Sequence, residues 1–156
     1  MSRTDTASVL VHAPRSDVFR ALLDPDARSA WLPPPGAHAT MERFDATDGG
    51  GYRMVLRFDE AGGGKSTDDT DVVEAEFAEI VTDRRVVERI EFASDDPRFA
   101  GTMTMTWALS GTEDRTIITV RATDVPDGID AGEHSRALTT SLEQLAAHVR
   151  AAADAS

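Results

Sequence analysis

Apolar residues recur with a period of two through most of the chain, and this pattern predicts β-strands. The clearest case is the range 101–110, where Met103, Met105, Trp107 and Leu109 alternate with threonines. In the range 52–59 the large apolar residues again occupy every second position. Further strands are expected over the ranges 6–13, 38–45, 72–81, 85–93 and 115–123.

Two short helices are expected after the first strand. Val18 and Leu22 lie on one face of a helix over residues 14–23. Asp24 and Pro25 form a cap-and-proline start signal for a second helix that ends near Trp31.

The last third of the chain changes to a helical period. Leu138, Leu142, Leu145 and Val149 follow one another at spacings of three and four residues. This is the apolar stripe of a helix over about 131–152, and Asp130 with Glu133 suits its capping box. A single α+β domain over residues 1–156 follows, with one face of an antiparallel sheet covered by this helix.

The order of several short motifs resembles a known family. The motifs comprise several residue pairs near the N-terminus, a turn with an aspartate and two glycines, a Glu-Ile pair, and two leucines in the last predicted helix. They are Ala13-Pro14, Val18-Phe19, Ala21-Leu22, Asp24-Pro25, Trp31, Asp45, Gly49-Gly50, Arg53, Glu79-Ile80, Arg85-Val86-Val87, Leu142 and Leu145. In this order they resemble the START-like helix-grip (SRPBCC) superfamily, and most closely the branch named after the activator of the heat-shock-protein-90 ATPase.

The resemblance implies a curved antiparallel sheet of six to seven strands gripping the long C-terminal helix, with an internal pocket between them. Members of the superfamily bind lipids, hormones or polyketides, some cyclise or dehydrate their ligand, and others are chaperone partners. The chain departs from the family at Thr82, where a proline is common, and at Ala137-Leu138, where Gly-Trp is frequent. Leu138 would leave a roomier interior unless Trp107 fills the gap.

The apolar side chains that would face the helix are the candidate ligand-binding residues. The alternative is that they form an ordinary packed core. Flexible methionines suit a site that adapts to different guests. The candidates are Tyr52, Met54, Phe58, Phe77, Met103, Met105, Trp107 and Leu138.

Two residues are weak catalytic candidates. Glu88 shares strand parity with Val86 and Ile90, so strict alternation directs its carboxylate inward, where it could act as a general acid or base. A shifted register, with Val87 on the inner face, would instead send it to solvent. His134 lies one turn before Leu138 and could bond a ligand or move a proton, or it could be a solvated first-turn histidine.

Charge and composition restrict the partners. Sixteen basic against 28 acidic residues give a net charge of −12, which disfavours nucleic acid and anionic lipid. No segment resembles a membrane span or a signal peptide, so we expect a cytoplasmic protein. An acidic surface is typical both of a GC-rich genome and of adaptation to high salt, and unfolding in increasing NaCl would separate these explanations.

The sequence indicates no metal site and no cofactor. There is no cysteine and no His-x-x-x-His pair. Gly62 to Ser66 resembles a phosphate-binding loop, but Asp59 stands where the nucleotide motif needs a glycine. The acidic residues Asp68, Asp69 and Asp71 are expected to be solvated.

Three functions remain open at this point. The first is binding of an apolar or aromatic small molecule between sheet and helix, where Arg53, Arg57 or Arg89 could meet an anionic group. The second is a cyclase or dehydratase acting on a polyketide-like ligand through Glu88 or His134. The third is a chaperone cofactor or stress-response interaction protein, as the family name suggests.

Overall fold

The computed structural model describes residues 3–60, 62 and 64–154. Within these residues one seven-stranded sheet is accompanied by three α-helices and one 3₁₀ turn. The strands are β1 (Thr4–Val11), β2 (Ala37–Asp45), β3 (Gly51–Phe58), β4 (Thr70–Val81), β5 (Arg85–Phe92), β6 (Met103–Gly111) and β7 (Thr116–Thr123). The helices are α1 (Arg15–Leu23), α2 (Pro25–Trp31), η1 (Pro97–Phe99) and α3 (Ala131–Asp154).

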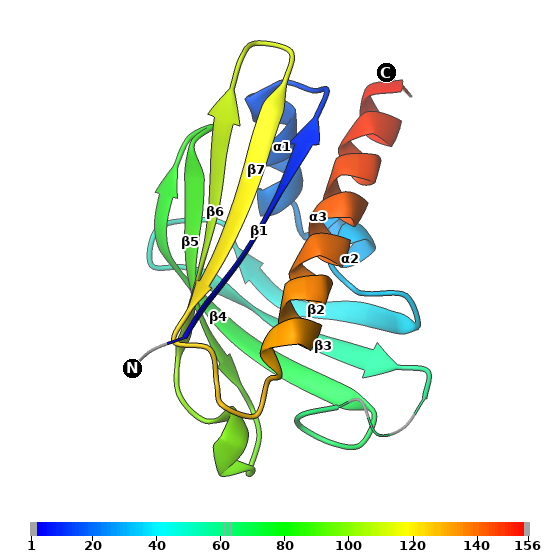
Figure 1. The fold of residues 1–156 in the computed structure, drawn as a ribbon, viewed down its shortest axis with the longest axis vertical. Coiled ribbons are helices and arrows are strands. Elements are labelled where there is room, and N and C mark those ends of the chain that lie inside the picture. The colour runs from blue at the N-terminus through cyan, green and yellow to red at the C-terminus, as the bar shows by residue number, and fades with distance from the viewer. Residues whose placement is uncertain (1–2, 61, 63, 155–156) are drawn as a thin grey trace.

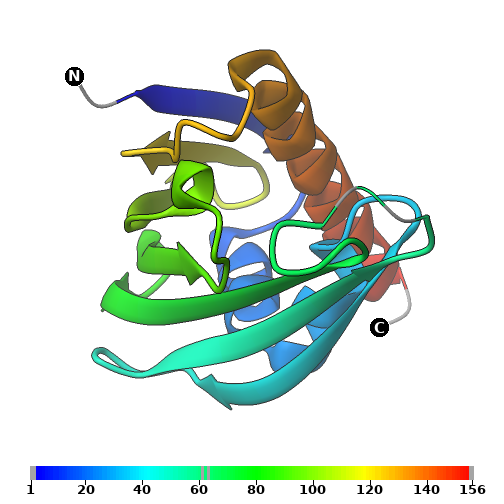
Figure 2. The same cartoon turned by 90° about the horizontal axis from the view of Figure 1, so that it is seen from below.

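The sheet is antiparallel throughout and has the strand order β1-β7-β6-β5-β4-β3-β2. Strands β1 and β2 therefore form opposite edges, and α1 and α2 connect them. The sheet curves around α3, which runs across its open side (Figures 1 and 2). This is the helix-grip α+β fold that the sequence predicted.

Local sequence signals explain how α2 is placed. The Asp24 carboxylate caps its first turn by accepting from the backbone N–H groups of Asp26 and Ala27, and Pro25 occupies the first turn. At the other end, Trp31 donates from Nε1 to the carbonyl of Ala21 at 2.9 Å. Gln144 of α3 donates to the carbonyls of Trp31 and Pro33 at 2.7 and 2.8 Å, which ties α2 to the long helix.

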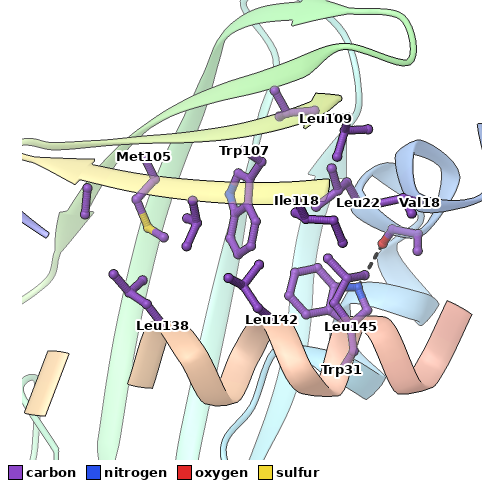
Figure 3. Close-up of a cluster of buried hydrophobic side chains, with 14 of the residues drawn as sticks. Val18, Leu22, Trp31, Met105, Trp107, Leu109, Ile118, Leu138, Leu142 and Leu145 are labelled. Carbon is purple, nitrogen blue, oxygen red and sulfur yellow. Dashed lines mark hydrogen bonds between the residues drawn. The ribbon is translucent and has the colours of Figure 1, made fainter. Parts of the chain in front are cut away.

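The core lies between α3 and the concave face of the sheet. Leu138, Leu142 and Leu145 of α3 point toward β6 and β7, where Trp107 and Ile118 are buried (Figure 3). The stripe predicted from spacing is therefore the buried face of this helix. Its amphipathic character, with polar residues on the opposite side, is what holds it on the sheet.

The predicted elements agree with the structure, with differences at their ends. Strand β1 begins and ends two residues before the predicted range, and Pro14 is the N-cap of α1 rather than its first helical residue. The turn η1 was not predicted. Among the described residues, no helix is both long and apolar enough to cross a membrane.

Candidate functional site

A pocket of about 460 Å³ lies between the sheet and the first turns of α3. Strands β3, β4, β5 and β6 supply its wall, and Arg28 of α2 closes one side together with Leu32, the residue that follows this helix. From α3, residues at helical spacing (His134, Leu138 and Ser141) face it. The volume falls within the range typical of small-molecule sites.

Most of the candidate binding residues lie in the wall of this pocket. Phe77 is the exception: it is fully buried but packs outside the lining, against Phe44 and Tyr52, with ring centroids 5.6 and 5.7 Å away. The candidates that do line the pocket are Tyr52, Met54, Phe58, Met103, Met105, Trp107 and Leu138. Trp107 and Leu138 therefore both line this pocket, and Trp107 does not fill the space beside Leu138.

The inner end of the pocket holds a buried ion pair. Arg28 of α2 donates from Nη1 to Oε1 of Glu88 on β5, and the two side chains are 0% and 1% exposed. The second carboxylate oxygen, Oε2, accepts from the Tyr52 hydroxyl at 3.4 Å and from Trp107 Nε1 at 3.3 Å. Both charged groups belong to the pocket lining.

Aromatic rings surround the guanidinium. Cζ of Arg28 lies 5.1 Å from the Tyr52 ring centroid, 5.7 Å from Trp31 and 5.8 Å from Trp107. Nε and Nη2 of Arg28 are buried and have no hydrogen-bond partner in the part of the chain that the structure describes, so these cation–π contacts and Glu88 are what offset its dehydration. Burial alone would lower the pKa of Arg28, but Glu88 and Tyr52 together, through attraction and hydrogen bonding, outweigh burial and the pKa is raised. The pKa of Tyr52 is raised by burial and by the nearby Glu88 carboxylate.

The structure thus decides between the two expectations for Glu88. Its side chain faces inward, as strict alternation required, and Val87 is not the inner residue. A bulge does occur nearby, between Phe77 and Glu79 on β4, but it leaves Glu88 paired with Phe77 and pointing inward. All three neighbours use the carboxylate as an acceptor, which favours a structural charge partner over a proton carrier.

Arg28 was not anticipated from the sequence. A signal was available, because Arg28 precedes Trp31 by three residues and therefore shares its helix face. An inward carboxylate on β5 also requires a buried cation or donor as partner. The three arginines that the sequence suggested as partners of an anionic ligand group face outward, and none of them lines the pocket. Arg53 pairs with Glu42 and Glu74, Arg57 pairs with Asp69, and Arg89 pairs with Glu76.

The β3–β4 loop contributes the rim on one side. Lys65 donates from Nζ to Asp71 Oδ2 at 2.8 Å and lies 5.0 Å from the Phe92 ring centroid. The Asp71 side chain is 3% exposed, so the expectation that it is a solvated acid is wrong. Lys65, part of the glycine-rich segment, is therefore held at the pocket by an internal ion pair. Residue 63 of that segment lies outside the described residues.

The other side of the rim is the start of α3. His134 Nδ1 lies 2.7 Å from Oδ2 of Asp5 on β1, and the two side chains are 12% and 6% exposed. Asp130 caps the helix by accepting from the N–H of Glu133 at 2.9 Å, as the predicted capping box required. Of the two expectations for His134, the solvated first-turn histidine is therefore wrong: the residue is largely buried and lines the pocket.

No group of three or more potential ligands among the described residues could hold a metal ion. The pocket lining combines four carboxylates (Asp71, Glu88, Asp130 and Glu133) with Arg28 and Lys65 as permanent cations. The site is thus apolar along its walls and slightly acidic overall. Such a lining disfavours strongly anionic guests.

Comparison with known proteins agrees with this architecture. A protein of Chromobacterium violaceum, CV1439, superposes with a TM-score of 0.82 at 28% identity, covering 94% of this chain and 96% of that one. Mll3558 of Rhizobium loti gives 0.68 at 27% identity over 95% and 97%. DynU16, a protein in the dynemicin biosynthetic locus, gives 0.66 at 20% identity over 94% of this chain and 47% of that one, which shows a shared fold.

None of the curated proteins is significantly similar to this chain. The family model described as "Activator of Hsp90 ATPase homolog 1-like protein" matches residues 12–150. This match includes the pocket walls, both partners of the buried ion pair and most of α3. The chain therefore belongs to the Activator of Hsp90 ATPase homolog 1-like family.

Proposed function

We propose that this protein binds an apolar or aromatic small molecule in the pocket between its sheet and α3. The observation that carries the proposal is a space of about 460 Å³ whose walls are mainly aromatic side chains, methionines and branched aliphatics. Burial of a guest there is favourable by about 25 cal/mol per Å² of apolar surface, before the costs of association.

The polar groups at the inner end favour a neutral guest. Arg28 is already neutralised by Glu88, and the rest of the lining carries more acids than bases. A carboxylate or phosphate placed there would find Arg28 already paired, so no free cation would offset the loss of its own hydration. The guest is therefore expected to be an uncharged ring system or hydrocarbon.

The proposal is tested by a substitution that places a large side chain in the pocket and leaves the buried core residues unchanged. Ala137 lies in the lining on α3, and its own side chain packs little, since the residue is exposed. Ala137→Trp should weaken binding of the neutral probe N-phenylnaphthylamine by roughly tenfold or more, about 1.4 kcal/mol. Fluorescence titration of the probe, with quenching of the protein's tryptophans as a second signal, measures it.

Ala147→Trp is the matched control. Ala147 is also exposed on α3 but does not line the pocket, so this variant should bind the probe like the wild type. Equal loss in both variants would point to a disturbed helix. Absence of binding to the wild-type protein, by this probe and by a panel of uncharged aromatics, would overturn the proposal.

The family description supports a second candidate, a role as a chaperone cofactor. Such a role depends on a surface rather than on the pocket. Ala137→Trp would then leave stimulation of a heat-shock-protein-90 ATPase unchanged. No stimulation by the wild-type protein would dismiss this candidate.

A further inference from the structure

The rim of the pocket contains a histidine whose orientation is set by a buried carboxylate. Asp5 Oδ2 accepts from Arg3 Nη2 at 3.2 Å and lies 2.7 Å from His134 Nδ1. Because Asp5 acts as an acceptor toward Arg3, the same oxygen accepts the Nδ1 proton of His134. In the neutral imidazole the lone pair is then on Nε2.

Nothing in the described part of the chain uses that lone pair. Nε2 of His134 makes no hydrogen bond to any of these residues, while the imidazole lies in the pocket lining. Its neighbours on the same face of α3 are Ala137, Leu138 and Ser141, which are also lining residues. Asp5 packs behind the ring on β1 and is absent from the lining.

From this geometry we infer that His134 is a specificity-determining residue that accepts a hydrogen bond from a hydroxyl group of the ligand, with Asp5 as its positioning residue. The ligand class is an uncharged aromatic or apolar molecule bearing a phenolic or enolic O–H. The inference rests on the proposed function, because it concerns the polar selectivity of the same pocket. The lining carries four carboxylates against two cations, and this excess of acids disfavours the ionised form of such a ligand, so the neutral hydroxyl is the group that His134 recognises.

The test compares three probes of one ring size: 2-naphthol, 2-methoxynaphthalene and 2-naphthoate. Isothermal titration or displacement of N-phenylnaphthylamine gives their affinities. The wild-type protein should bind 2-naphthol roughly three- to tenfold more tightly than its methyl ether, which is the range of one net hydrogen bond. It should bind 2-naphthoate more weakly than 2-naphthol.

Two variants test whether His134 causes the preference for 2-naphthol. His134→Leu should remove the preference for 2-naphthol while retaining binding of the methyl ether. His148→Leu replaces a histidine of the same helix that does not line the pocket, and should keep the wild-type preference. The circular-dichroism spectrum and thermal midpoint of each variant report whether α3 remains folded.

Asp5→Ala and Asp5→Asn together provide a readout that a merely structural role would not move. Asp5→Ala removes the acceptor that holds the Nδ1 proton of His134, so the preference for 2-naphthol should fall while the methyl ether still binds. In Asp5→Asn the amide oxygen can take the place of Oδ2 and accept from both Arg3 and His134, so the conservative variant should keep the preference. These variants also serve if His134→Leu does not fold.

The possible results are distinguishable. If the three naphthalenes and the fluorescent probe all fail to bind, the proposed function fails. If they bind and the wild-type protein does not prefer 2-naphthol, or if either His134→Leu or Asp5→Ala keeps the preference, only the inference about His134 is overturned. Tighter binding of 2-naphthoate than of 2-naphthol would also overturn it, because His134 would then act as a cationic donor.

Discussion

The ion pair at the inner end of the pocket and those on the outer face of the sheet use the same residue types in opposite environments. Arg28 and Glu88 are 0% and 1% exposed, whereas Arg53 and its partner Glu74 are 42% and 40% exposed. In the interior, water solvates neither charge, so each depends on the other and on nearby aromatic rings. On the outer face, water solvates both partners and their separation costs little. The contribution of an arginine to the stability of this protein therefore depends on whether the arginine is buried, and not only on whether it has an acidic partner.

The sharpest way to test this comparison is to remove the buried cation. Arg28→Met should lower the free energy of unfolding by about 3–5 kcal/mol, because Glu88 is left as an uncompensated buried charge. Urea unfolding followed by circular dichroism measures the loss. A loss below about 1 kcal/mol would show that the inner pair behaves like a surface pair.

Removing both charges should restore part of this loss. In Arg28→Met with Glu88→Gln, the amide oxygen still accepts from Tyr52 and Trp107, and no charge remains unpaired. The double variant should be more stable than Arg28→Met by about 1–3 kcal/mol. If the double variant were as unstable as the single one, packing of the Arg28 side chain rather than its charge would be responsible.

Tyr52 reports on the same inner end through its titration. It is the single tyrosine of the chain, so its ionisation can be followed in the near-ultraviolet spectrum. Its pKa is raised in the folded protein by burial and by Glu88, while in the unfolded chain it is about 10. The folded state therefore keeps its proton when the unfolded state loses it. The resulting contribution to stability is complete below pH about 10 and declines as the pH rises toward the folded pKa, by at most about 1.4 kcal/mol per pH unit.

Ionisation of Tyr52 should accordingly coincide with alkaline unfolding. The same titration in concentrated urea should give a midpoint near the usual value for an exposed tyrosine. A midpoint near 10 in the folded protein, with circular dichroism unchanged, would contradict burial of this hydroxyl beside Glu88.

The smallest effect is expected on the outer face. Arg53→Met removes the partner of Glu42 and one of the two arginine partners of Glu74, yet should change the free energy of unfolding by less than about 1 kcal/mol. The pKa of Arg53 is raised by hydrogen bonds to these two carboxylates, but the side chain stays in contact with water. Urea unfolding at low and high salt measures the effect, and a loss comparable to that of Arg28→Met would remove the distinction between the two regions.

Much of the fold could be predicted because its signals are local. Alternation along β6 and the leucine spacing of α3 each follow from a repeat within one element. The cap at Asp24 likewise depends on residues within one turn. Such patterns report which face of an element is buried, since side-chain direction is set by the geometry of the helix or strand.

The candidate site was predictable only in part, because its polar groups come together from distant segments. Alternation indicated that Glu88 faces inward, but its partner Arg28 lies sixty residues earlier, on a helix whose packing the pattern does not describe. His134 was singled out from its position one turn before Leu138, whereas its partner Asp5 is 129 residues away. Phe77 was expected among the lining residues, but it packs against Phe44 of β2 and lies outside the lining.

The sequence alone determined the order of elements, the apolar face of each and, through its family resemblance, the grip of the sheet on the last helix. Tertiary structure decided which charged groups meet inside that grip, which arginines face water, and where the walls leave space unfilled. The physical reason is that hydrophobic burial is non-directional and is encoded by repeating patterns, so a single segment reveals it. A buried charge or an oriented imidazole requires one particular partner at hydrogen-bond distance, and only the folded chain brings that partner there.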